Sequence, residues 1–430
     1  MSKTIVIVGT LNTKECEGYY LKQRIEEFEH RAILLDASMK EYRPELGNPE
    51  ISNDQVAKAA GTTIEKVESL ERVDAGKLMI EGLTKIVQEL YKDQKLDGII
   101  GYGGSVGLTL SSSTMKALPL GVPKLVITTL ADKAGRFIGA KDILICPSIT
   151  DMAGGRVVNT IEATMLANAA AAISGMVESN PVVPEEKPMI VASQFGVTTP
   201  HVSKAKQVLE NKGYELISFH ATGTGGQWLE ELVRSGIASG VLDVTTHELV
   251  DELVGGVCLA GPNRMEAAGD QGVPQIILPG ALDMVNFWAP NTVPGKFKNR
   301  YFYYHVPEQV TLMRTTKAEC EKLGKIVAQK VNKASGPTVV AIPLRGWSQY
   351  DRENGPMCVD YVGNDTEVKW YNPENDQAFV ESVENHVDKT KPNVEIMKAD
   401  FHINDPKFAE LMANILDDMI NGRWKKGYYG

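Results

Sequence analysis

Three side chains in the C-terminal half of the chain have the right chemistry to hold a metal ion. His220 lies in the glycine-rich stretch Ser218-Phe-His-Ala-Thr-Gly-Thr-Gly-Gly226, between a predicted strand and a predicted helix. Glu248 and His305 belong to the same set of reactive side chains near predicted strand ends. Imidazole nitrogen and carboxylate oxygen suit Mn²⁺, Zn²⁺ or Fe²⁺. We therefore predict a divalent metal, Mn²⁺ or Zn²⁺, held by His220, Glu248 and His305.

Three further side chains could transfer protons or stabilise negative charge beside that metal. His247 directly precedes Glu248. Asp283 follows the predicted strand 275–278, and Arg314 lies further along the chain. Histidine and carboxyl groups can move protons, and arginine can hold an oxyanion or a carboxylate product. We predict His247 and Asp283 as the proton-transfer groups and Arg314 as the partner of the oxyanion.

The N-terminal half carries two glycine-containing loops that suit a phosphate. One loop, Gly9-Thr-Leu-Asn-Thr-Lys14, follows the predicted strand 4–8, and the other, Gly101 to Gly107, follows the predicted strand 96–100. Backbone N–H groups, hydroxyls and a lysine at strand ends favour an anion. Neither loop has the spacing of a P-loop or of a complete dinucleotide fingerprint. The predicted nucleotide-binding residues are Gly9, Thr10, Thr13, Lys14, Gly103, Gly104 and Ser105.

Each of these features also has a purely structural interpretation. The glycines can serve tight strand-to-helix turns, and a single histidine is more often packed in a core than bound to a metal. Helix capping and turn formation compete for Glu248 and Asp283. No two of the C-terminal residues have the local spacing of a metal motif such as H-E-x-x-H. The functional interpretation depends on several of them meeting at one sheet edge.

The order of the predicted elements determines where that edge lies. Strands alternate with helices along both halves, which is typical of a parallel sheet covered on both faces. The proline-rich and acidic segment 178–188 separates the halves. We predict an α/β protein with two doubly wound, Rossmann-like parallel-sheet domains, at residues 1–180 and 188–430. Ligands of such sheets bind at the carboxyl ends of the strands. The aromatic runs 286–288 and 301–304 are expected in the core or at a subunit interface.

Composition limits the classes of partner. The chain has 430 residues, a formal net charge of −10 and no Lys/Arg-rich run with interleaved aromatics, so we do not expect a nucleic-acid partner. No apolar run approaches the roughly 20 residues of a membrane span, and the N-terminus does not resemble a signal peptide. Five widely spaced cysteines without a CxxC pair predict reduced thiols in a cytoplasmic protein, without disulfides or a zinc site. We expect a small-molecule substrate.

Several strings of residues resemble the tomato mosaic virus resistance protein family, a family of ATP-binding proteins. The N-terminal strings span residues 9–14, 103–105 and 117–124. The C-terminal strings span residues 219–226, 248–256, 279–286, 310–315 and 402–406. The resemblance covers nearly the whole chain. It implies two α/β domains, a homo-oligomer, and an ATP·Mg²⁺ site in the first domain.

The chain departs from the family pattern at a few positions. Asn12 replaces an aspartate of the usual G-T-x-D-T-K, and Val106 and Leu108 alter the usual G-G-S-G-G-T. A valine adds bulk where the family has a glycine beside the expected phosphate. In the second half, His247 stands where the family usually has threonine, which adds an imidazole beside Glu248. These departures count against ATP binding and favour chemistry in the second half.

Two functions remain as hypotheses. The first is a metal-dependent hydrolase of a small carbonyl compound, in which the ion polarises a ketone and activates water. Since the family resemblance suggests a place beside catabolic enzymes for small carbonyl compounds, we add a specific reaction. This reaction is the C–C bond cleavage that opens a cyclic β-diketone such as dihydrophloroglucinol. The alternative is an ATP·Mg²⁺-binding protein that acts through ligand sensing or partner binding.

Overall fold

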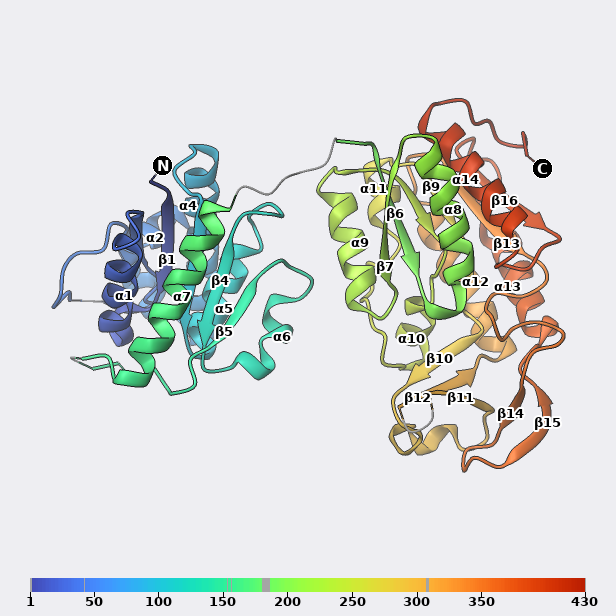
Figure 1. The fold of residues 1–430 in the computed structure, drawn as a ribbon, viewed down its shortest axis with the longest axis horizontal. Helices are drawn as coiled ribbons and strands as arrows, with labels where there is room; N and C mark the ends of the chain where they lie inside the picture. Colours follow the sequence, from blue (N-terminus) through green and yellow to red (C-terminus); the bar gives the residue numbers. More distant parts are fainter. Residues whose placement is uncertain are drawn as a thin grey trace. The chain divides into compact units, whose positions relative to one another are not determined.

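The chain folds into two compact units, Met1–Val183 and Pro184–Gly430, each with its own parallel sheet (Figure 1). The computed structural model describes residues 2–41, 43–152, 154–155, 157–179, 186–306 and 309–429. The predicted class, α/β with two parallel-sheet domains, is confirmed. Part of the predicted linker, residues 180–185, lies outside the described residues.

A five-stranded parallel sheet with the strand order β2-β1-β3-β4-β5 forms the centre of the first unit. The strands are β1 (Thr4–Gly9), β2 (Arg31–Asp36), β3 (Gly98–Gly103), β4 (Lys124–Thr128) and β5 (Leu144–Pro147). The helices are α1 (Leu11–Glu26), α2 (Asn53–Ala59), α3 (Ile64–Glu68), α4 (Arg72–Lys92), α5 (Ser105–Met115), α6 (Gly135–Ile138) and α7 (Thr160–Glu178).

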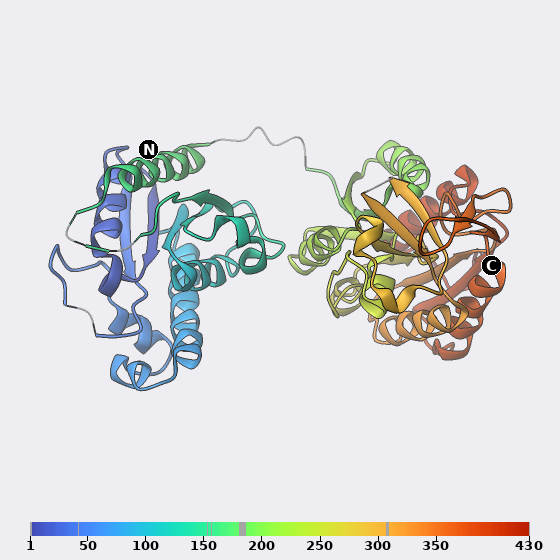
Figure 2. The same cartoon turned by 90° about the horizontal axis from the view of Figure 1, so that it is seen from below.

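Helices cover both faces of this sheet (Figure 2). Ile5 and Ile7 of β1 belong to the apolar cluster that includes α1 and α7. Val6 and Val8 belong to the cluster on the opposite face, with α2, α4 and α5. Successive side chains of a strand point to opposite faces, so a continuous apolar run is what a doubly covered strand requires. This explains why β1 was predictable from its sequence.

Helix α7 meets the length and composition of a membrane span, as the core helix of an α/β domain also can. Its Leu166, Ala170 and Ile173 are buried in the cluster that contains Ile5 and Ile100 of the sheet. Its apolar character therefore comes in part from packing inside the first unit, where 39% of the apolar window is buried.

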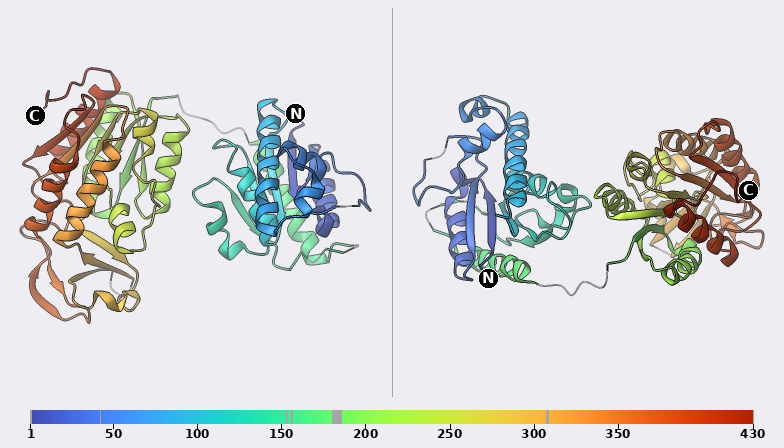
Figure 3. Two further views of the ribbon diagram at one scale, coloured as in Figure 1. Left: turned by 180° about the vertical axis from the view of Figure 1, so that it is seen from behind. Right: turned by 90° about the horizontal axis from the view of Figure 1, so that it is seen from above.

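The second unit is built on a six-stranded parallel sheet with the order β16-β13-β9-β8-β6-β7. Its strands are β6 (Met189–Gln194), β7 (Glu215–His220), β8 (Ala238–Asp243), β9 (Gln275–Ile277), β13 (Thr338–Pro343) and β16 (Val394–Ala399). Its helices are α8 (Thr199–Asn211), α9 (Thr224–Arg234), α10 (Glu248–Val254), α11 (Ala267–Gln271), α12 (Lys317–Val331), α13 (Pro373–His386) and α14 (Pro406–Ile420). The pairs α8–α14 and α12–α13 pack on opposite faces (Figure 3).

An antiparallel sheet in the second unit was not predicted. Its strand order is β10-β12-β11-β14-β15. The strands are β10 (Met284–Phe287), β11 (Phe302–Val306), β12 (Val310–Arg314), β14 (Met357–Val359) and β15 (Asp365–Lys369). Two of them, β10 and β11, contain most of the aromatic runs 286–288 and 301–304. These runs are therefore strands, and Phe287 and Phe302 point into the core.

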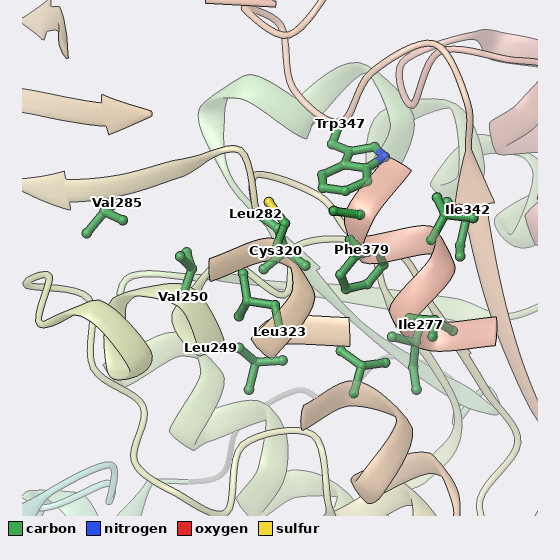
Figure 4. Close-up of a cluster of buried hydrophobic side chains, with 14 of the residues drawn as sticks. Leu249, Val250, Ile277, Leu282, Val285, Cys320, Leu323, Ile342, Trp347 and Phe379 are labelled. Carbon is green, nitrogen blue, oxygen red and sulfur yellow. The ribbon is translucent and has the colours of Figure 1, made fainter. Parts of the chain in front are cut away.

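A shared apolar core joins the antiparallel sheet to the rest of the second unit (Figure 4). Val285 of β10 lies in the same cluster as Leu249 of α10, Cys320 of α12 and Phe379 of α13. Trp347, which is 1% exposed, stacks edge-on against Phe379 with ring centroids 5.1 Å apart. The antiparallel sheet is thus part of the second unit and is held beside the carboxyl end of the parallel sheet.

The two parallel sheets share one strand order at their start. In each, the first strand lies between the second and the third. The connection after β1 therefore runs in the opposite direction to the connection after β3, and the same holds for β6 and β8. Adjacent connections that diverge leave a crevice at the carboxyl ends of these strands, where ligands of open α/β sheets bind. Each unit therefore has one expected binding position.

Candidate functional site

A pocket of about 270 Å³ lies at the carboxyl ends of β6 and β7, next to the expected position in the second unit. Phe195, which directly follows β6, and His220, the last residue of β7, form one side. Asn286 of β10 and His305 of β11 form the other side. The unpredicted antiparallel sheet therefore supplies part of the wall of this pocket.

The pocket lining is mainly apolar, and within the described residues it contains no Lys, Arg, Asp or Glu. Its polar side chains are His220, Thr222, Cys258, Asn286 and His305. The buried side-chain oxygen of Asn286 has no hydrogen-bond partner within the described part of the chain. Such a lining suits a small uncharged molecule with a hydrogen-bond donor better than a phosphate or a carboxylate.

His247, Asp251 and Cys258 form a buried group of metal-ligand type beside this pocket. One ligand atom from each of the three lies within 4.8 Å of the others. His247 and Asp251 are four residues apart at the start of α10 and so share one helix face. His247 Nε2 is 3.5 Å from Asp251 Oδ2. Cys258, which follows α10, also lines the pocket.

The hydrogen bond of His247 to the backbone sets its tautomer. Its Nδ1 is 3.1 Å from the carbonyl oxygen of Ala281. Since a carbonyl only accepts, Nδ1 carries the proton and the lone pair of the neutral ring is on Nε2. Nε2 is directed at Asp251 Oδ2, 3.5 Å away, and at Cys258, without a hydrogen bond of ideal geometry to either within the described residues. Histidines that bind metals are oriented in this way by a hydrogen bond from the other ring nitrogen.

Asp251 determines both the geometry and the electrostatics of this group. Its Oδ2 accepts from the N–H of Cys258 at 2.8 Å, and its Oδ1 accepts from the N–H of Asn286 at 2.9 Å. Burial lowers the pKa of His247, but the combined charge and hydrogen-bond interactions with Asp251 and Cys258 outweigh burial and place this pKa well above its usual value. A cation at this position is therefore favoured, either a proton or a metal ion.

The structure does not gather His220, Glu248 and His305 into one ligand set within the described residues. Glu248 Oε1 accepts from the N–H groups of Gly223 and Gly226 at 2.7 and 3.0 Å. The glycine-rich loop thus binds a carboxylate of the protein itself. Glu248 is a structural residue, whereas His220 and His305 do line the pocket.

The two pocket histidines are held by aromatic neighbours. Phe195 stacks on His220 and on His247, with ring centroids 5.1 and 5.0 Å apart. His305 Nδ1 is hydrogen-bonded to the hydroxyl of Tyr350. Burial raises the pKa of Tyr350 to about 12, so its hydroxyl stays protonated and can donate to Nδ1. The other ring nitrogen of His305 remains available for a ligand.

A buried arginine that sequence reasoning missed holds Glu248 in place. Arg264, 1% exposed, donates from Nε to Glu248 Oε2 at 2.6 Å. Its two terminal nitrogens donate to the two oxygens of Asp243, both at 2.6 Å. Glu230 lies 3.5 Å from the same guanidinium. One arginine thus connects β8, α9 and α10, and no local sequence pattern marks it.

Asp283 and Arg314 do not line the pocket. Asp283 is fully buried, and its Oδ2 accepts from Ser348 and from the indole of Trp370. Burial, together with nearby Asp351, raises the pKa of Asp283 to about 6. Arg314 donates to the Asp376 carboxylate at 2.9 Å and to the backbone carbonyls of Trp370 and Asp283. These contacts occupy the donors of Arg314, and neither residue lines the pocket, so the structure does not bring them to a substrate bound there.

The first unit has a larger cavity, of about 700 Å³, at its own switch point between β1 and β3. Five of the seven predicted nucleotide-binding residues line it: Thr10, Thr13, Lys14, Gly104 and Ser105. The lining also contains the cations Lys40 and Arg72 and one acid, Glu68. In a chain of net charge −10, this excess of cations favours an anionic ligand.

The backbone of the first loop is less available to a phosphate than predicted. The N–H of Leu11 donates to Asp36 and that of Asn12 to Ser38, at 3.1 and 3.0 Å. The N–H of Lys14 donates to the carbonyl of Thr10. An anion would therefore meet hydroxyls, the Lys14 ammonium and the amino end of α5, which begins at Ser105.

Gly9 and Gly103, the other two predicted residues, are not among the residues that line the cavity. A Cβ on Gly9 would lie 2.0 Å from the ring of Tyr102, so this glycine is needed for packing. Gly103 has a φ of +127°, which an L side chain rarely adopts. Both glycines therefore shape the loops around the cavity without forming its surface.

The two halves match two models of uncharacterised protein family UPF0261. The model of its N-terminal domain matches residues 3–181, and the model of its C-terminal domain matches residues 187–420. The chain belongs to the UPF0261 family. A UPF0261 protein of Clostridium tetani is 43% identical over 98% of this chain and 100% of its own length. A UPF0261 protein of Rhizobium meliloti is 37% identical over 97% of this chain and 100% of its own length.

The resemblance to tomato mosaic virus resistance proteins is also confirmed. The ToMV resistance protein Tm-1 of Solanum lycopersicum is 36% identical over 78% of this chain, which corresponds to 43% of the tomato protein. The UPF0261 descriptions name no activity, so ATP binding stays a prediction for this chain.

Replacing Arg264 with methionine should destabilise the second unit by about 3–5 kcal/mol, because three carboxylates would lose their buried partner. The matched control is Arg345→Met, since Arg345 pairs with Asp400 at an exposed position and should matter little. Urea unfolding followed by circular dichroism measures both changes. Equal stability of the two variants would contradict the role that we assign to Arg264.

Proposed function

We propose that this protein is a divalent-metal-dependent hydrolase of a small carbonyl compound. The observation that carries the proposal is the buried group of His247, Asp251 and Cys258, whose ligand atoms lie within 4.8 Å of one another. Cys258 also lines the 270 Å³ pocket, so an ion held by this group would be next to a bound substrate. The proposal keeps the predicted class of reaction and replaces the predicted ligand set.

The three donors favour Zn²⁺. A thiolate, an imidazole and a carboxylate are ligands that zinc accepts, whereas Mn²⁺ prefers oxygen-rich sites. Catalytic zinc sites commonly use three protein ligands and leave one position for water or substrate. An ion in such a site polarises a carbonyl group and lowers the pKa of bound water. Cys258 was expected to be a reduced thiol outside any zinc site, and this proposal gives it a chemical role.

Two histidines replace Asp283 and Arg314 as the side chains that act on the substrate. His220 and His305 line the pocket, and imidazole exchanges protons near neutral pH. Tyr350 fixes the Nδ1 side of His305, so the Nε2 side can serve the substrate. The side-chain oxygen of Asn286 can accept a hydrogen bond from a hydroxyl group. Aromatic side chains such as Phe195 and Trp288 provide flat surface for a ring.

The proposed substrate remains a cyclic β-diketone such as dihydrophloroglucinol, opened by hydrolysis of a C–C bond. The support for it is the small size of the pocket and the absence of charged side chains from its described lining. We further propose a cytoplasmic homo-oligomer. All five cysteines are free, which fits a reducing compartment.

Metal binding tests the proposal directly. Chelator-stripped protein should take up one equivalent of Zn²⁺ per chain, and a Zn²⁺ concentration about 100 times Kd should raise the melting temperature by a few degrees. His247→Ala and Cys258→Ser should each weaken uptake at least about tenfold, because each removes one ligand. Elemental analysis and thermal melting measure both effects.

The matched control is Cys146→Ser, which changes a thiol in the first unit. It should bind zinc as the parent does, and so should Glu248→Gln if it folds. Zinc uptake that is unchanged in Cys258→Ser, or that disappears only in Glu248→Gln, would contradict the new ligand set. It would favour the set predicted from the sequence, His220, Glu248 and His305. Zinc uptake without hydrolysis of cyclic diketones would support the metal site and contradict the proposed substrate.

A second function has its own supporting observation. The 700 Å³ cavity of the first unit combines Thr10, Thr13, Lys14 and Ser105 with the further cations Lys40 and Arg72. Its volume lies within the usual range of ligand pockets, roughly 300–1,000 Å³. This supports the alternative of an ATP·Mg²⁺-binding protein that acts through ligand sensing or partner binding. The two functions lie in different units and can coexist.

Calorimetric titration with ATP·Mg²⁺ tests the second function. We expect binding by the parent protein and at least about a tenfold loss in Lys14→Ala, because a charge-assisted contact to phosphate would disappear. Lys95→Ala, which removes an exposed lysine paired with Asp93, is the control and should bind as the parent does. Equal binding by Lys14→Ala would show that the nucleotide lies elsewhere.

A further inference from the structure

A second hollow, of about 370 Å³, continues the anion cavity of the first unit. The two hollows share Met39, Arg72, Ser105 and Val106 in their linings. The second hollow runs along α4 and α5, away from the loop that contains Lys14. The two hollows therefore adjoin, and a ligand anchored in the first has the second directly beside it.

The second hollow has a mainly apolar surface. From α4 it receives Val73 and Ile80, and from α5 it receives Val106 and Leu110. Val73 and Ile80 are seven residues apart, so they lie two turns apart on one face of the helix. Val73 is 70% exposed, so its apolar surface is accessible to a ligand in this hollow.

The helix α4 is shaped to leave this groove open. Gly76 lies between Val73 and Ile80 on the same face, and its missing side chain leaves space that is bounded by the sulfur of Met39. Lys77, at the edge of the groove, is paired with Asp74 at 2.9 Å. The charge of Lys77 is thus balanced by its own helix, and the groove itself stays apolar.

The first hollow is cationic, in contrast to the mainly apolar second hollow. Lys14, Lys40 and Arg72 face one acid, Glu68, in its lining. Arg72 belongs to both hollows and so marks the boundary between the cationic part and the apolar part. The arrangement is complementary to a molecule with an anionic head at one end and an apolar tail at the other.

We propose that the first unit binds a phosphate ester or phosphate-linked compound that carries an unbranched apolar tail. The phosphate lies among Thr10, Thr13, Lys14 and Arg72, and the tail lies in the groove between α4 and α5. This goes beyond the nucleotide proposal, because the 700 Å³ cavity alone has the volume that a nucleotide needs. It is also independent of the hydrolase proposed for the second unit.

Calorimetric titration of the full chain with inorganic phosphate and with hexyl phosphate separates the two parts of the ligand. Hexyl phosphate should bind at least about tenfold tighter than phosphate, since each buried methylene contributes about fourfold in affinity. Val73→Asn combined with Ile80→Asn should remove this gain and keep the affinity for phosphate. Arg72→Gln should weaken both ligands.

The control for the double variant is Val362→Asn, which makes a similar change at an exposed valine of the second unit. It should bind both ligands as the parent does. Equal affinity of the parent for phosphate and hexyl phosphate would overturn the proposal, and so would an unchanged gain in the double variant. Tight ATP·Mg²⁺ binding without any gain from the hexyl chain would leave the nucleotide function standing and overturn the apolar subsite.

Discussion

The candidate active site depends on one buried arginine and the carboxylates around it. Arg264 holds Asp243 at the end of β8 and Glu248 at the start of α10. Glu248 in turn holds the backbone of the glycine-rich loop through Gly223 and Gly226. Because unpaired buried charges are very costly, these elements can only adopt an arrangement in which all the contacts form together. The pocket wall and the metal-ligand group are attached to this arrangement through α10.

Asp251 connects the same helix, α10, to the antiparallel sheet. It is three residues after Glu248 on α10, and it accepts hydrogen bonds from the backbone of Cys258 and Asn286. The helix that Arg264 fixes therefore also fixes one possible metal ligand and one side of the pocket. Ligand sites at a switch point need walls on both sides of the crevice, and here the second wall is a separate sheet joined through shared core residues such as Val285.

Sequence reasoning succeeded where the signal is local. The loops after β1 and β3 were predictable because strand, glycine turn and helix follow one another directly. Glu248 was misassigned because its partner, Arg264, is sixteen residues away with no pattern to link them. The pair of His247 and Asp251 has a local signal, the spacing of four on a helix, but His247 was interpreted only as a proton-transfer group beside Glu248. Cys258 could be added only from the tertiary structure, since the turn after α10 brings it back.

The charges of the two units suit different ligands, and this agrees with the chemistry proposed for each. Hydrolysis of a C–C bond next to a carbonyl group of a cyclic β-diketone adds water and yields a keto acid, which is a carboxylate at neutral pH. The described lining of the second pocket contains no arginine or lysine that could pair with this carboxylate. Arg314 already pairs with Asp376. A zinc ion bound by one thiolate and one carboxylate would form a group without net charge. The described lining thus offers no cation to retain a carboxylate product, whereas the cationic cavity of the first unit suits an anion.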